Sequence, residues 1–219
     1  MLNNEYIFSI RITYAKVNIF DFWPKKEYSK TMEKKKLNLQ DLLADKPEIK
    51  YCCAKQAINT SRDNPKALYP DFDFFPAFLD SDKNVMKWTA TIIIGNLSRV
   101  DSKNKVDRLI PKLIALLSDP MMITAGNAIK ALGEIAGHKP KYREKILKAL
   151  LSVGKNKYYS KGKISPECTN VAIQQVLVSL EKFGPEVLQR NDVKFFLKKQ
   201  TKNSRLKVKK ISAQLLKNT

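Results

Sequence analysis

The chain has 219 residues, a hydrophobic fraction of 43% and seven glycines, which allows one core or one short repeat array and excludes a collagen-like or low-complexity chain. The cysteine count is three with no C-x-x-C pair, which excludes a disulfide scaffold and predicts small core residues in an intracellular, cytoplasmic protein. The net charge is +20, and residues 139–219, with 20 basic and 5 acidic side chains, carry +15 of it, which indicates an acidic partner.

The N-terminal residues 1–36 do not fit the pattern of the rest of the chain. They contain a weakly alternating stretch that Arg11 and Lys16 interrupt, which excludes a signal peptide and a membrane-spanning helix there. We expect a non-repeat extension, either disordered or an over-called start with Met32 as the natural first residue. A second domain is expected over residues 37–219.

An internal repeat organises this second domain. Residues 82–97 match residues 120–135 at an offset of 38, and Gly95 falls on Gly133. The apolar positions of both copies recur at helical spacing, which predicts two amphipathic helices. A glycine in the last turn of each helix allows either tight packing on a neighbour or a C-terminal break.

A second apolar helix precedes each copy, over residues 73–79 and 109–117, and a short turn rich in Asp, Ser and Pro joins the two helices. A helix–turn–helix unit with a period near 37 predicts an α-solenoid. Loops are expected over residues 60–65 and, as an expanded turn, over residues 154–163, and Pro185 is expected to begin a linker. Further helix pairs are predicted over residues 39–43 with 49–58, 142–153 with 170–180, and 192–197 with 205–216.

The turn aspartate, the spacing from Val85 to Ala90, and the apolar–glycine pairs ending in Gly95 and Gly133 resemble HEAT or HEAT-like repeats. The resemblance covers about residues 37–219. It implies an all-α, right-handed α-solenoid of about five helix pairs, and it carries little information on function because such arrays serve many roles. The chain departs from the family where an arginine is usual in the second helix, because that position holds Lys50, Met86 and Thr124.

No catalytic constellation is recognisable in the sequence. His138 is the only histidine and lies beside Lys139 and Pro140 at a helix end, where no Ser/His/Asp or Cys/His set with nearby partners can be assembled. No group of residues has metal-ligand spacing, and no phosphate-binding glycine loop is present. We therefore expect no catalytic residue, no metal and no cofactor, which favours a non-enzymatic protein.

In HEAT arrays the second helices usually line the concave face, so the resemblance implies a partner-binding surface there. Trp88 has two readings, because an aromatic beside cations can anchor a peptide or stack a base, whereas it can also pack between repeats. The expected partner-binding residues are Lys50, Lys55, Lys87, Trp88, Asn127, Lys130, Asn170 and Gln174.

Basic residues interleaved with tyrosines near the expanded turn, and a second basic cluster over residues 198–210, can hold a phosphate backbone. The competing interpretation is a solvated loop and a charged terminal surface, because Lys outnumbers Arg 34 to 7 and phosphate recognition favours Arg. The expected polyanion-binding residues are Lys155, Lys157, Tyr158, Tyr159, Lys161, Lys163, Lys207, Lys209 and Lys210.

Two functions follow from these patterns. The first is a non-enzymatic scaffold that binds a protein or peptide through its concave face. The alternative is a nucleic-acid-binding protein that uses its basic C-terminal repeats, of which a HEAT-like DNA glycosylase is a variant. Salt dependence distinguishes them, since phosphate binding weakens steeply with salt and apolar anchoring does not.

Overall fold

The computed structural model describes residues 36–217, so the expectations for the N-terminal extension concern residues outside the described range, apart from Lys36. The chain divides into two compact units, Met1–Cys53 and Ala54–Thr219, and each is considered by itself. The described part of the first unit holds a 3-10 helix, Leu39–Leu43, and the first turns of α2 (Pro47–Asp63). None of the described helices is both long and apolar enough to span a bilayer.

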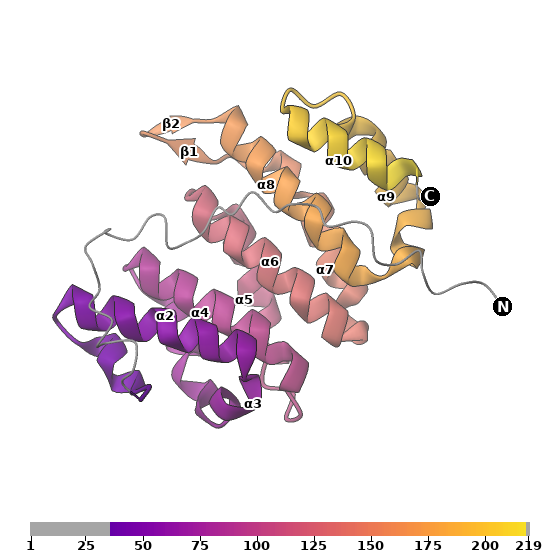
Figure 1. Cartoon of the computed structure of the whole chain (residues 1–219). Coiled ribbons are helices and arrows are strands. Elements are labelled where there is room, and N and C mark those ends of the chain that lie inside the picture. The colour runs from indigo at the N-terminus through magenta and orange to yellow at the C-terminus, as the bar shows by residue number, and fades with distance from the viewer. Residues whose placement is uncertain (1–35, 218–219) are drawn as a thin grey trace. The chain divides into compact units, whose positions relative to one another are not determined.

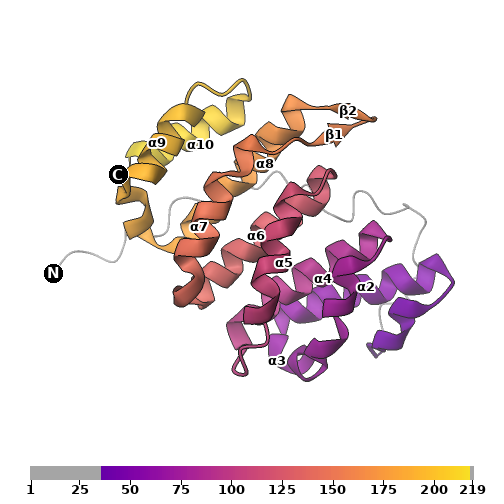
Figure 2. The ribbon, with the colours of Figure 1, turned by 180° about the vertical axis from the view of Figure 1, so that it is seen from behind.

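The second unit is an all-α solenoid in which helices alternate between two layers. Helix α4 packs on α6, α6 on α8, and α8 on α10, and these four helices form what we call the even layer (Figure 1). Helices α5, α7 and α9 lie behind them in the odd layer, which faces the viewer in Figure 2. The helices after α2 are α3 (Pro65–Leu68), α4 (Asn84–Leu97), α5 (Ile110–Ala115), α6 (Met122–His138), α7 (Arg143–Leu151), α8 (Pro166–Ser179), α9 (Asn191–Gln200) and α10 (Leu206–Lys217).

The first element of each pair is short and partly 3-10 helical. The predicted helix over residues 73–79 is instead two 3-10 helices, Tyr69–Phe74 and Pro76–Asp80. Proline lacks the N–H of a helix interior and its ring clashes with the preceding turn, so Pro76 separates the two pieces. Phe72 and Phe75 are nonetheless fully buried, so these short pieces still bring large apolar side chains to the core.

The matched glycines allow neighbouring helices of the even layer to approach closely. A Cβ atom added at Gly95 would lie 2.7 Å from the Cα of Ala131, and one added at Gly133 would lie 2.9 Å from the Cβ of Ser179. Both helices continue past their glycine, to Leu97 and to His138. Of the two readings left open by the sequence, tight packing is therefore the right one at both positions.

The expanded turn over residues 154–163 is a β-hairpin rather than an open loop. Strand β1 (Tyr159–Ser160) pairs with β2 (Lys163–Ile164) in an antiparallel ribbon. The two linking residues, Lys161 and Gly162, have φ values of 51° and 75°, and two left-handed residues are what a tight two-residue hairpin requires. The prediction missed it because Lys-Gly is a weak hairpin signal beside Asn-Gly or Asp-Gly.

Two other connections differ from the prediction. Helix α2 continues through most of the expected loop over residues 60–65 and ends at Asp63, where the Nδ2 of Asn96 on α4 donates a 2.8 Å hydrogen bond to the Oγ of Ser61. The linker expected from Pro185 is a 3-10 helix, Pro185–Gln189. Residues with loop-like composition are thus ordered by contacts to the adjacent pair.

Candidate functional site

Of the two interpretations of Trp88, packing between repeats is the one that agrees with the structure. Trp88 is only 6% exposed, and its indole Nε1 donates a 2.8 Å hydrogen bond to the Oγ1 of Thr124 on α6. Buried tryptophans need such a partner for their N–H group. Trp88 therefore joins α4 to α6, and the prediction that it binds a partner is corrected.

Three further residues expected to bind a partner are engaged within the protein. The Nζ of Lys87 lies 3.4 Å from the Oδ2 of Asp119 in the turn before α6. Gln174 on α8 is buried and accepts a 3.2 Å hydrogen bond from the Nε of Arg205. Asn170 donates to the Oγ of Ser204 at 2.9 Å. These side chains connect successive pairs.

Two expected residues on α6 remain suited to a ligand. Asn127 is 7% exposed and its Nδ2 has no hydrogen-bond partner among the described residues. Lys130 lies one turn further along the same face of α6, its side chain is exposed, and enclosure of its ammonium by surrounding protein lowers its pKa. Lys50 and Lys55 are both half-buried on α2, in different units, so the site is built from the second unit alone.

A cluster of buried ionisable groups lies beyond the ends of α4 and α6, and sequence analysis did not find it. Asp101 has a fully buried side chain whose carboxylate lies 2.9 Å from the Nζ of Lys139 and accepts a 2.6 Å hydrogen bond from the hydroxyl of Tyr69. Burial alone would raise the pKa of Asp101, but the hydrogen bonds from Tyr69, Lys139 and two backbone N–H groups hold it below its ordinary value.

This cluster is a structural connection between pairs rather than a reaction centre. The ammonium of Lys139 is also shared with the backbone oxygen of Asp101 and the side chain of Asn104, at 3.1 and 2.8 Å. Every strong donor of the lysine therefore has an acceptor inside the fold. Across the described part of the chain, no group of three or more His, Cys, Asp or Glu side chains is arranged to hold a metal ion.

The hairpin is anchored rather than free, which changes the interpretation of the basic residues around it. Tyr158 is fully buried and its hydroxyl donates a 2.7 Å hydrogen bond to the backbone oxygen of Leu117. Asn156 donates to the same oxygen at 2.9 Å, and the N–H of Tyr159 donates to Pro120 at 3.1 Å. Tyr158 is therefore an anchor, and its expected role in binding a polyanion is corrected.

The lysines expected to bind a polyanion do not converge on one place. Tyr159 is exposed, Lys207 is half-buried, and the remaining lysines are exposed, on the hairpin side or on α10. One of them, Lys157, lines a groove that the sequence did not reveal, whereas the other six lie outside it. The lysines outside the groove are Lys155, Lys161, Lys163, Lys207, Lys209 and Lys210.

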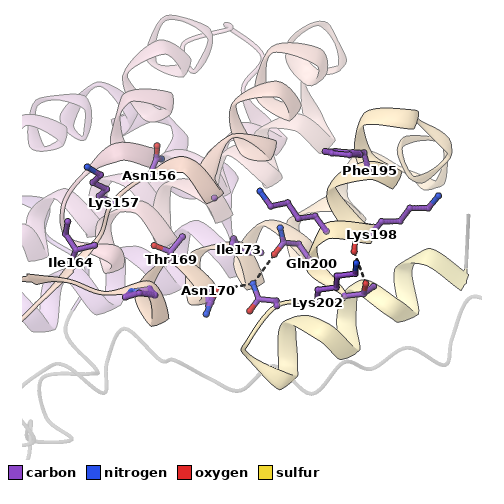
Figure 3. Close-up of a pocket in the computed structure, with 15 residues that line it drawn as sticks. Asn156, Lys157, Ile164, Thr169, Asn170, Ile173, Phe195, Lys198, Gln200 and Lys202 are labelled. Atoms are coloured by element: carbon purple, nitrogen blue, oxygen red, sulfur yellow. Dashed lines mark hydrogen bonds between the residues drawn. The ribbon is translucent and has the colours of Figure 1, made fainter.

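The groove, which we call the hairpin groove, has a volume of about 1070 Å³ and lies between the hairpin, α8, and the end of α9 with its following turn (Figure 3). Phe195 is 73% exposed at its edge. This exposure was detectable from the sequence, because Phe195 falls outside the i, i+3, i+4 stripe formed by Val193, Phe196 and Leu197. The lining residues that carry its chemistry are Lys157, Ile164, Phe195, Lys198, Lys199 and Lys202.

Solved structures with a similar fold are designed or engineered repeat proteins, and at this low sequence identity they give information on the fold alone. The designed armadillo repeat protein YIII(Dq)4CqI is 16% identical, with 82% of this chain and 79% of that chain covered and a TM-score of 0.55. A related design, YIII(Dq.V1)4CPAF, solved in complex with the peptide (KR)4, is 14% identical with the same coverage and a TM-score of 0.58. An engineered protein is 16% identical over 82% of this chain and 76% of that chain, with a TM-score of 0.56.

No family model and no curated protein matches the sequence. Identities this low carry the fold alone, so the similarity supports a helical-repeat solenoid without deciding between HEAT and armadillo classes. Within the second unit, a short first element precedes each even-layer helix, as in repeats built from helix pairs.

Proposed function

We propose that the chain is a non-enzymatic, HEAT-like scaffold that binds an extended segment of a protein partner on the even layer, centred on Asn127 and Lys130. The observation that carries the proposal is the unpartnered Nδ2 of Asn127 among the described residues. A buried donor without an acceptor costs about 1–3 kcal/mol. Because this nitrogen is itself buried, the Asn127 side chain rotates toward the surface when a backbone carbonyl of a bound peptide supplies the missing acceptor.

Lys130 supports the same site with a charge. Its side chain is exposed, so its ammonium is available to pair with a carboxylate of a ligand. Asn127 and Lys130 are three residues apart on one helix, so their side chains are neighbours on its surface. The proposed ligand therefore presents a main-chain carbonyl and, close to it, an acidic side chain.

The designed neighbour in complex with (KR)4 shares the solenoid fold but not this charge preference. The present chain has a net charge of +20, so a basic peptide would be repelled on approach, whereas an acidic segment would be attracted. We accordingly take peptide binding as the proposed function and expect the ligand charge to be opposite to that of (KR)4.

The nucleic-acid alternative receives less support. Arginine is the side chain best suited to bidentate phosphate and base contacts, and all six described arginines already make an ion pair or hydrogen bond with another group of the protein. Trp88 is buried, so it does not provide the accessible aromatic that a HEAT-like glycosylase would use. The engaged arginines are Arg62, Arg99, Arg108, Arg143, Arg190 and Arg205.

Site-specific photo-crosslinking tests the proposal. A benzoylphenylalanine placed at Lys130 should capture a defined protein from an extract of the source cells, while one at Lys145, an exposed residue of the odd-layer helix α7, should not capture it. The captured partner, once purified, should bind an Asn127→Leu variant about tenfold more weakly than the unchanged protein, the effect of losing one good hydrogen bond in a buried contact. Equal capture from both positions, or unchanged affinity of the variant, would contradict the proposed site.

A further inference from the structure

The hairpin groove has fixed walls. On one side, the anchored hairpin positions Ile164 and Lys157. On the other, Asn203 donates hydrogen bonds of 2.9 Å to the Oδ1 of Asn170 and 3.0 Å to the Oε1 of Gln200. These amides tie the turn after α9 to α8, so the groove needs little reorganisation before a ligand enters, which lowers the entropic cost of binding.

The charge of the groove is of one sign. Four lysines line it and no carboxylate does. Neighbouring acidic groups are already paired with arginines, as in the ion pair between Glu167 and Arg205. In the described structure, no ion pair neutralises the four groove lysines, which are Lys157, Lys198, Lys199 and Lys202.

Apolar side chains line the groove beside these lysines. Phe195 and Ile164, which are 73% and 55% exposed, stand at the groove together with the nearly buried Ile173 (Figure 3). Large apolar side chains left this exposed around a concave surface commonly mark an interaction site. Burying them requires an apolar group on the ligand.

The geometry points to a second binding site, for an acidic peptide segment that packs one aromatic or branched aliphatic side chain on Phe195 at the edge of the groove while its carboxylates pair with the groove lysines. The chemistry of the groove favours this ligand over single-stranded nucleic acid. Stacking of successive bases uses several aromatic rings, whereas Phe195 is the one aromatic among the residues that line the groove. The site is separate from Asn127 and Lys130 and does not depend on the function proposed for them.

The test is fluorescence anisotropy with the full chain and three labelled probes. The first is a peptide of glutamates with a central Phe-Leu pair, the second is the same peptide with Ser-Ser in the centre, and the third is a single-stranded DNA of equal length. We expect the first peptide to bind more tightly than either other probe. Weaker binding of the Phe-Leu peptide than of the DNA, or equal binding of the two peptides, would overturn the assignment.

Charge-matched variants then place the site. Lys198→Gln with Lys202→Gln should weaken binding of the Phe-Leu peptide about tenfold, through two lost charge contacts. Lys145→Gln with Lys210→Gln removes the same charge from exposed positions outside the groove and should weaken it less than about threefold, because distant surface charges are screened. Equal losses in the two double variants would show bulk attraction and overturn the site.

An apolar pair of variants tests the anchor. Phe195→Ser should weaken binding of the Phe-Leu peptide about fivefold and leave the Ser-Ser peptide unaffected, since only the first loses an apolar contact. Leu206→Ser is the control, because Leu206 is similarly exposed at 64% and does not line the groove. A loss of the same size in the control, or none in Phe195→Ser, would contradict the proposed anchor.

Discussion

Two contacts between neighbouring elements differ in the side chains that form them: the contact between α4 and α6, and the contact between α8 and the turn after α9. At the first, a glycine lets the helices approach and the polar atoms of Trp88 and Thr124 satisfy each other in the interior. At the second, side-chain amides such as Asn170 and Asn203 bridge the elements near solvent and leave the hairpin groove between them. One repeat architecture thus produces a closed contact where small residues meet and a ligand-sized space where long polar ones do.

The buried ion pair beside the closed contact gives the largest expected effect. Asp101→Asn leaves the ammonium of Lys139 without its buried carboxylate partner, which should lower the free energy of unfolding by about 3 kcal/mol. Urea denaturation measures this. The control, Asp80→Asn, removes an exposed ion pair with Lys112 and should change the free energy of unfolding by less than about 0.5 kcal/mol. Similar losses in both variants would show that burial does not set the strength of the Asp101 contact.

The same pair predicts an acid limit to stability. Because the pKa of Asp101 is lower in the folded protein than its unfolded value of about 3.9, its contribution is fully present above that pH and is lost as the pH falls through the folded-state value. As the pH is lowered, the midpoint temperature of thermal unfolding should therefore fall more steeply for the unchanged protein than for Asp101→Asn. Parallel pH profiles would contradict the expected shift.

Adding a methyl group to the closed contact should open it. Gly95→Ala places a Cβ 2.7 Å from the backbone of Ala131, and such overpacking costs about 2 kcal/mol. Gly126→Ala, also in an even-layer helix, meets nothing closer than the Sδ of Met122 at 3.9 Å and should stabilise by about 0.5–1 kcal/mol through helix propensity. Chemical denaturation of the two variants should thus show changes of opposite sign.

The unpartnered amide on α6 separates binding from stability. Asn127→Leu removes a buried donor that lacks an acceptor in the described structure, and we expect the free energy of unfolding to rise by about 1 kcal/mol. Calorimetry of the protein without ligand measures it. A loss of stability would show that Asn127 supports the fold and would weaken its assignment to ligand binding.

The smallest effect is expected at the open contact. Phe195→Ser changes a side chain that is 73% exposed, so the free energy of unfolding should stay within about 0.5 kcal/mol of the unchanged protein. Denaturation profiles should superimpose even though the Phe-Leu peptide is bound more weakly. A large loss would mean that Phe195 packs in the core, and the groove comparison would fail.

The solenoid was predictable because its determinants repeat along the chain. The match of Gly95 with Gly133, and the apolar stripe around each, predicted two helices that the structure places at Asn84–Leu97 and Met122–His138. The predicted element boundaries were less accurate where an element ends at a contact with another element. At the C-terminal end of α2, for example, residues with loop-like composition remain helical where Ser61 accepts a hydrogen bond from Asn96 on α4.

The sites were less predictable for the same reason. Trp88 was recognised as notable, but its partner Thr124 lies 36 residues away and only packing places the two together. The groove needs the hairpin, α8 and the turn after α9 at once, and the chain entering the hairpin is held by the hydrogen bond from the Tyr158 hydroxyl to the backbone oxygen of Leu117. Charge clusters that looked separate in the sequence, Lys157 and the lysines after residue 197, meet across the groove.

The hydrogen bonds between pairs have a consequence for the order in which the chain folds. Those of Asn96, Trp88 and Tyr158 join residues 35, 36 and 41 positions apart, so each requires closure of a loop about one repeat long. Short loops cost little entropy to close, and arrays with only such contacts fold quickly and from more than one starting point. Once one helix pair has folded, the adjacent pair can pack on its surface. Folding can therefore proceed along the solenoid in either direction.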